Sequence, residues 1–159
     1  MKMVDVGAKP RTRRVAVATG RVRLSALALR RIRDGQVEKG DVLAAARLAG
    51  IMATKRTPDL IPLCHPVAIT GVEVTVVPAE GAVEVTATVR TADRTGVEME
   101  ALTAVCAATL TVYDMLKSTD RGMVIEAVQL MHKRGGRTGV WNRVTARPRA
   151  AGRPAPGRG

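Results

Sequence analysis

The stretch TGVEMEALTAVCAATLTVYDMLK, residues 95–117, decides the fold of this chain. Charged residues occur only at its two ends, and the thirteen residues between Glu100 and Asp114 carry no charge. At 100° per residue, one side of the predicted helix is lined by Leu102, Val105, Thr109, Val112 and Leu116. The opposite side has no Lys or Glu either, so the pattern predicts a buried helix that needs cover on both faces.

The length of this helix bears on function. Glu100 and Asp114 are fourteen residues apart and nearly in phase, which separates them by roughly 21 Å. One small substrate does not easily reach both ends. If both ends carry chemistry, the simplest geometry is a site completed between protomers, with one helix end from each. A second subunit would also cover the outer face of the helix, so we expect a homo-oligomer.

The composition is that of one modest domain with an unusual core. Of 159 residues 46% are hydrophobic, but there is no Phe, one Trp and one Tyr. A core of Val, Ala, Leu, Ile and Met buries little area per side chain, so a lone protomer is expected to be marginally stable. We place one catalytic domain at residues 1–141 and a disordered basic tail at residues 142–159.

The formal charge of +12 includes five Arg of the tail, and the body still carries +7. A body this basic favours an anionic partner, and phosphate is the usual one; charge alone does not separate a nucleotide from a nucleic acid. Cys64 and Cys106 have no second ligand at metal spacing and are expected to be reduced thiols. No apolar run reaches membrane-spanning length and no signal-peptide pattern is present, so we expect a soluble cytoplasmic protein.

The rest of the chain predicts strands, helices, a hairpin, the long helix and a last strand. Residues 11–24 alternate like one or two strands broken at Gly20. Helices are expected at 25–35 and 41–56, capped by Ser25 and Asp41. A hairpin is expected at 69–89 and a strand at 123–131, after an irregular stretch at 1–10. This order favours an α+β architecture with helices on one face of an antiparallel sheet.

Two loops are candidates for display of functional groups. Residues 57–66, TPDLIPLCHP, contain three prolines, and the loop is expected to be rigid, with Leu60, Ile61 and Leu63 buried. Residues 132–139, HKRGGRTG, form a basic glycine-rich loop. It lacks the Walker spacing but fits a phosphate cradle, although a solvated basic turn has the same pattern.

Several charged residues allow both a structural and a functional interpretation. Asp114 and Lys117 stand three apart on the helix and form either a surface ion pair or an acid–base pair whose lysine is tuned by partial burial. Glu98 and Glu100 point to different sides, so they are no glycosidase-like pair, and helix capping explains one of them. His65 is either structural or a general acid or phosphate ligand.

Together these segments resemble the molybdenum cofactor biosynthesis protein C family, whose members are cyclic pyranopterin monophosphate synthases. The resemblance rests on MVDVGAK (3–9), KGDVLAAARLAGIMATKRTPDLIPLCHP (39–66), the stretch 95–117 and GGRTG (135–139). It implies a ferredoxin-like α+β protomer and a hexamer, a trimer of dimers, with active sites at protomer interfaces. It also implies a lyase reaction in which 3',8-cyclo-7,8-dihydro-GTP, supplied by an upstream radical enzyme, becomes cyclic pyranopterin monophosphate and pyrophosphate.

Carried over position by position, the resemblance implies the following site. The catalytic residues are Asp114, Lys117 and Lys39. The substrate-binding residues are Leu63, Cys64, His65, Glu98, Met99, Glu100, Lys55, Lys133 and Arg137. No metal ligand and no organic cofactor are expected, and a divalent cation such as Mg²⁺ is compatible with the pyrophosphate. The chemistry needs proton transfers and no redox change, which Lys and carboxylate groups can perform.

Two other classes of protein compete with this reading. A non-catalytic nucleic-acid-binding module would explain the charge, but such modules stack bases on aromatic side chains, and only Tyr113 and Trp141 are available. A structural assembly protein would explain the uncharged helix but leaves the LCHP and EME segments without a role.

Overall fold

The computed structural model describes residues 1–144, and residues 145–159 lie outside the described part. Five strands form one sheet: β1 (Thr12–Arg23), β2 (Ile69–Ala79), β3 (Ala82–Asp93), β4 (Val124–Arg134) and β5 (Val140–Asn142). The helices are α1 (Ala26–Arg33), α2 (Val42–Thr54), α3 (Thr57–Leu60) and α4 (Glu98–Leu116). The irregular start predicted for residues 1–10 is confirmed.

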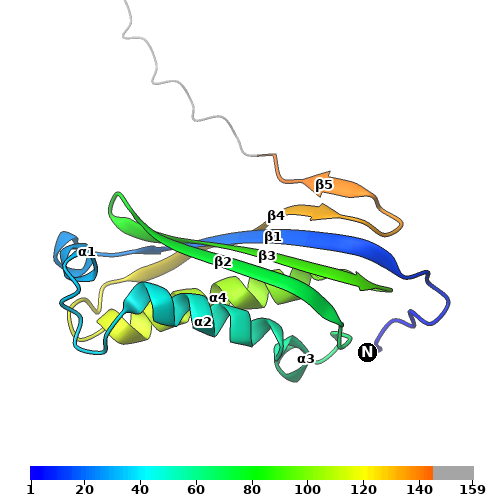
Figure 1. Ribbon diagram of the computed structural model, residues 1–159, viewed down its shortest axis with the longest axis horizontal. Coiled ribbons are helices and arrows are strands. Elements are labelled where there is room, and N and C mark those ends of the chain that lie inside the picture. Colours follow the sequence, from blue (N-terminus) through cyan, green and yellow to red (C-terminus); the bar gives the residue numbers. More distant parts are fainter. Residues whose placement is uncertain (145–159) are drawn as a thin grey trace, which may run out of the picture.

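The sheet has the strand order β2-β3-β1-β4-β5, with every neighbouring pair antiparallel. Figure 1 shows α2 and α4 lying side by side along one face of it. This arrangement confirms the predicted α+β, ferredoxin-like fold with helices packed on one face. The hairpin of β2 and β3 is also confirmed and is longer than predicted.

The predicted caps set the helix starts. The Ser25 side chain accepts a hydrogen bond from the Ala28 backbone N–H, and Asp41 does the same for Ala44. Because α2 begins beside the end of α4 and packs along it, the two helices run antiparallel. Gly50 lets them approach closely, since an added Cβ there would lie 3.1 Å from the Ala104 carbonyl oxygen.

The prediction that the first strand breaks at Gly20 is wrong. β1 is continuous, and Gly20 pairs with Val85 in the ladder with β3. A Cβ at position 20 would collide with Val105 of α4. The glycine therefore allows the long helix to lie close to the sheet and does not interrupt the strand.

The long helix packs as the charge-free pattern predicts. Val105, Thr109, Val112 and Leu116 are fully buried against the sheet. On the outer side Leu110 is 60% exposed and Cys106 is exposed. By length and composition alone α4 could cross a membrane, contrary to the expectation, but 56% of its apolar window is buried, as in a core helix.

The C-terminal boundary differs from the prediction. His132, Lys133 and Arg134, predicted as loop, belong to β4, which leaves residues 135–139 as the turn to β5. Asn142 pairs with His132, and the Arg143 backbone N–H donates to Met131 O, so both residues of the predicted tail are tied to the sheet. The rest of the predicted tail, residues 145–159, lies outside the described residues.

Candidate active site

Three charged groups meet at the C-terminal end of α4. Lys39 Nζ lies 2.7 Å from Asp114 Oδ2, and Lys117 Nζ lies 2.7 Å from Oδ1 of the same carboxylate. Lys39 also donates to the Asp114 carbonyl oxygen at 3.2 Å. One carboxylate thus holds two ammonium groups, in an arrangement that joins the three residues predicted to be catalytic.

This cluster is open in the single protomer. The exposed fractions of the side chains are 49% for Lys39 and 54% for both Asp114 and Lys117. Hydrogen bonds from Lys117 and Lys39 lower the pKa of Asp114 to about 2, so the carboxylate is ionised at neutral pH. The partial burial that we invoked for tuning the lysine is not provided by this chain alone.

A cavity of about 320 Å³ adjoins Lys117 and is lined also by Tyr113, Ser118 and Arg121. The loop after α4 forms part of its wall and is held in place. The Tyr113 hydroxyl donates to Arg121 O at 3.2 Å, and Asp120 Oδ2 accepts from the Ser25 backbone N–H at 2.7 Å. Sequence reasoning missed Tyr113 and Arg121 as neighbours of the lysine.

The other predicted group gathers at the N-terminal end of α4. Glu98 is the first residue of the helix, Met99 is 37% exposed, and Glu100 is 1% exposed. The Cys64 thiol lies 3.7 Å from Glu100 Oε1, which brings the LCHP segment against the helix. Burial first, then the charge of Glu100 and the hydrogen bond to it, raise the pKa of Cys64 to about 11, so this side chain is a neutral thiol.

The prediction that Leu60, Ile61 and Leu63 are all buried is wrong. Leu60 is 62% exposed, Leu63 is 46% exposed and Ile61 is partly exposed. Thr57–Leu60 is a short helix in place of an irregular loop. These apolar side chains lie outside the sheet and the helix layer, where no further layer of described residues covers them.

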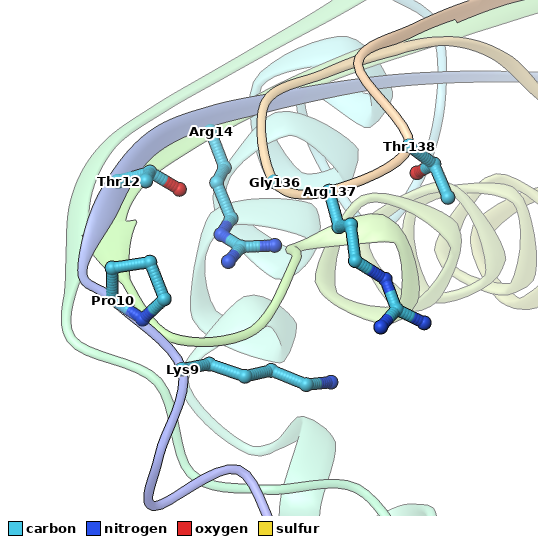
Figure 2. A pocket seen from close by; sticks show the side chains of 7 residues that line it. All are labelled: Lys9, Pro10, Thr12, Arg14, Gly136, Arg137 and Thr138. Atoms are coloured by element: carbon cyan, nitrogen blue, oxygen red, sulfur yellow. The ribbon is translucent and has the colours of Figure 1, made fainter.

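A second cavity, of about 560 Å³, lies between the start of the chain and the glycine-rich turn. Figure 2 shows the side chains that line it: Lys9, Pro10, Thr12, Arg14, Arg137 and Thr138, with Gly136. Arg14 is fixed by two hydrogen bonds, from Nε to Asp93 O at 3.0 Å and from Nη2 to Arg94 O at 2.8 Å. The cavity is basic, and Arg14 is held rigidly at its wall.

Sequence reasoning missed Lys9 and Arg14. The sequence did contain an indication for Arg14. It is two residues before Ala16 and four before Ala18 in the same strand, so its side chain lies on the same face of the sheet as theirs, which is the face toward the helices. An Arg on the apolar face of a strand must find polar partners. The glycine turn closes over it: Gly136 has φ +72°, and an added Cβ there would collide with the Arg14 guanidinium.

The two remaining basic residues of the prediction lie apart. Lys133 faces the helix side of the sheet, opposite Trp141 in the β4–β5 ladder, and its Nζ contacts the Thr138 hydroxyl at the rim of the basic cavity. Lys55, at the end of α2, lines a separate cavity with Met52 and Leu60. The described residues bring Lys55 to none of the other predicted side chains. Within residues 1–144, no three His, Cys, Asp or Glu side chains are grouped as a metal site.

Apart from Lys55 and the residues at the basic cavity, the predicted residues form two groups, one at each end of α4, and a family model covers both groups. The model described as the MoaC family matches residues 3–136. This chain belongs to the MoaC family. MoaC-family relatives share most of its length. A protein of Thermomicrobium roseum, named cyclic pyranopterin monophosphate synthase, is 60% identical over 144 residues, 89% of this chain and 87% of that protein.

Further relatives carry similar names. The cyclic pyranopterin monophosphate synthase of Novosphingobium aromaticivorans is 56% identical over 140 residues, which are 88% of this chain and 89% of the relative. Cyclic pyranopterin monophosphate synthase 2 of Mycobacterium tuberculosis is 56% identical over 141 residues, 89% and 84% of the two chains. The recognition made from the motifs is thereby confirmed.

Proposed function

We propose that this protein is a cyclic pyranopterin monophosphate synthase of molybdenum cofactor biosynthesis. In the proposed reaction, 3',8-cyclo-7,8-dihydro-GTP is rearranged to cyclic pyranopterin monophosphate and pyrophosphate is released, which makes the enzyme a lyase. Membership of the MoaC family and the names of relatives at 56–60% identity support the reaction. The observation that carries the mechanism is the cluster of Lys39, Asp114 and Lys117.

The cluster suits proton transfer. Lys117 is the proposed acid–base group, and Asp114 orients its ammonium through the 2.7 Å contact. Lys39 approaches the same carboxylate from the connection before α2 and adds a second positive charge. Two ammonium groups around one carboxylate leave a net positive site, which favours an anionic substrate.

The basic cavity suits the triphosphate. Its volume of about 560 Å³ is in the range of small-molecule sites. Arg14, Lys9 and Arg137 line it, and Lys133 reaches its rim through Thr138. Positive charge at this place would stabilise the oxygens on which charge develops as pyrophosphate leaves. A divalent cation could accompany the pyrophosphate there, as its substrate counter-ion.

The cluster of Lys39, Asp114 and Lys117 lies at the C-terminal end of α4, and the group around Met99 and Glu100 lies at the N-terminal end. Because this helix has nineteen residues, one protomer does not enclose the substrate with both groups. We therefore propose that each active site is completed between protomers of a homo-oligomer, for which the resemblance suggests a hexamer built as a trimer of dimers. The exposed apolar side chains of Leu48, Met52, Leu63 and Leu110 support this, because they leave the outer helix surface uncovered. The upstream radical enzyme would supply the substrate, and its origin from GTP suits a cytoplasmic location.

The direct test is conversion of purified 3',8-cyclo-7,8-dihydro-GTP, with detection of the pterin by mass spectrometry and of pyrophosphate by a coupled assay. Wild-type protein should form both products in equal amounts, and Lys117→Ala should form neither at a comparable rate. Lys117→Ala with wild-type turnover would remove the proposed role of the lysine.

A parallel binding measurement separates the enzyme from a nucleic-acid-binding module. GTP and a single-stranded oligonucleotide are titrated at two salt concentrations. Oligonucleotide binding that is tight and falls steeply with salt, without product formation from the cyclic substrate, would favour the module.

A further inference from the structure

A cavity of about 320 Å³ adjoins the proposed acid–base residue Lys117, and Tyr113, Ser118 and Arg121 complete its lining. We propose that this cavity binds the phosphate group that stays with the product, and that Arg121 is the residue that binds it. This inference rests on the proposed function, because it divides the triphosphate of the substrate between two cavities. The retained phosphate lies beside Lys117, and the departing pyrophosphate lies in the basic cavity.

The chemistry of the lining is the first argument. Lys117 and Arg121 bring positive charges, Ser118 brings a hydroxyl group, and none of the lining residues identified within residues 1–144 has a carboxylate. The nearby carboxylate of Asp114 already has one ammonium group on each of its oxygens. The cavity therefore offers several N–H and O–H donors and no negatively charged acceptor in its wall, which suits the oxygens of a phosphate group.

The second argument is the Arg121 guanidinium group itself. It is exposed and has no ion pair with any acid within residues 1–144. Asp120, its neighbour in the sequence, instead accepts backbone N–H groups on both carboxylate oxygens. A guanidinium group presents parallel N–H donors that match two oxygens of one phosphate. The charge of Arg121 is therefore available to an anionic ligand.

The third argument is the fixed position of the loop that carries Arg121. The Tyr113 hydroxyl donates to the Arg121 carbonyl oxygen at 3.2 Å. The Asp120 carboxylate accepts from the Ser25 N–H at 2.7 Å and from the Gly122 N–H at 2.9 Å. An exposed loop without such contacts would have to be ordered when a ligand binds, at a cost in affinity. Here the backbone that carries the guanidinium group is already held in place.

The assignment to the retained phosphate follows from the proposed reaction. The product is a monophosphate, so the two outer phosphates leave as pyrophosphate and the phosphate attached to the sugar stays. The basic cavity around Arg14 suits the outer phosphates, whereas Lys117 is proposed to act on the ring system. The phosphate attached to the sugar is the one nearest to this ring system. It is therefore the phosphate that lies beside Lys117, within reach of Arg121.

Three probes separate the two cavities. GMP carries only the retained phosphate, inorganic pyrophosphate represents only the departing group, and GTP contains both. Equilibrium dialysis of labelled GTP, with the other two compounds as competitors, gives three dissociation constants. Arg121→Ala should weaken the binding of GMP and GTP about 10-fold and leave that of pyrophosphate within a factor of about 2. Arg14→Lys should weaken pyrophosphate and GTP and leave GMP unchanged.

Two further variants control for charge and geometry. Arg30→Ala removes another exposed arginine, which lines neither cavity, and should leave all three dissociation constants unchanged. Arg121→Lys keeps the charge but not the paired donors, so its loss of GMP affinity should be only about 3-fold. Arg121→Ala should unfold at the same temperature as wild type, because Tyr113 contacts the backbone of residue 121 and not its side chain.

Each outcome decides one part of the proposal. A dissociation constant for GMP that is the same in Arg121→Ala and Arg30→Ala would overturn it, since Arg121 would then be a solvated surface arginine. Equal losses of affinity for GMP and pyrophosphate in Arg121→Ala would overturn the assignment to the retained phosphate. Absence of product from the cyclic substrate with wild-type protein would instead contradict the proposed function, and the binding comparison would still decide whether Arg121 binds phosphate.

Discussion

Lys39 and Asp114 are 75 residues apart in the sequence, yet Lys39 Nζ lies 2.7 Å from Asp114 Oδ2. The contact joins the connection before α2 to the last turn of α4, and it depends on the antiparallel packing of these two helices. With Lys117 on the other oxygen, the carboxylate is the shared element of the cluster.

Asp114→Asn should reduce turnover by at least about 10²-fold, because the amide no longer orients two ammonium groups. The midpoint of thermal unfolding should change little, since the side chain is exposed. The measurement is the initial rate of pyrophosphate release. Asp59→Asn is the matched control, because Asp59 forms a similarly exposed i,i+3 pair with Arg56 at 3.5 Å, and it should have wild-type activity. Equal rates for the two variants would contradict the role of Asp114.

Coexpression of two inactive variants should restore activity if each site takes one helix end from each of two protomers. His65→Ala impairs the N-terminal end of α4 and Lys117→Ala the C-terminal end. Random assembly of the two chains leaves about a quarter of the sites with both ends intact. Mixed oligomers, isolated through two affinity tags, should therefore recover about a quarter of wild-type turnover. Recovery no greater than that of the separate variants would place the two ends in unrelated sites.

Arg14→Lys should weaken nucleotide binding about 10-fold, because a lysine does not hold the Asp93 and Arg94 carbonyl groups in the same fork geometry. Equilibrium dialysis with GTP as the probe measures the dissociation constant. Arg11→Lys is the control, since Arg11 is exposed and lies 3.9 Å from Asp93. Unchanged affinity in Arg14→Lys would exclude the basic cavity as the phosphate site.

Gly20→Ala should destabilise the protein by about 1–3 kcal/mol, because the added methyl group collides with Val105 and lies 3.2 Å from Val128 Cγ2. Urea unfolding gives the free energy. Gly71→Ala is the matched control in a neighbouring part of the sheet, where the nearest side-chain atoms are 4.0 Å from the added Cβ. Similar free energies for the two variants would mean that α4 does not approach β1 as described.

Asp120→Asn should remove a pH-dependent part of the stability. Backbone N–H groups of Ser25 and Gly122 lower the pKa of Asp120 below its ordinary value of 3.8, the Ser25 contact being the larger cause. The contribution is therefore present above pH 3.8 and is lost as the pH falls through the lowered pKa. The difference in unfolding free energy between wild type and Asp120→Asn should be about 1 kcal/mol at pH 7 and shrink toward pH 3. A difference in unfolding free energy that stays constant over this pH range would contradict a stabilising role of the ionised Asp120 carboxylate.

The local elements were accessible from sequence. The caps at Ser25 and Asp41 and the charge-free run between Glu100 and Asp114 predicted helices that the structure contains. The errors arose where the cause is non-local. Gly20 resembled a strand break because the reason for the glycine is not local. The helix that requires a residue without a side chain at this position contacts it through Val105, 85 residues further along the chain. Leu63 was predicted to be buried because it is apolar. An apolar residue type does not indicate whether the side chain is buried by its own chain or by another subunit.

Residue types, periodicity and motifs by themselves determined the strands, the helices, the family and the members of the candidate site, because these depend on neighbours along the chain. Only the tertiary structure decided which distant groups meet. Lys39 and Asp114 are 75 residues apart, and Cys64 and Glu100 are 36 residues apart. Arg14 is 79 and 80 residues from Asp93 and Arg94, whose carbonyl groups it binds. Such contacts follow from the register of the sheet and the packing of helices on it, which no local pattern specifies.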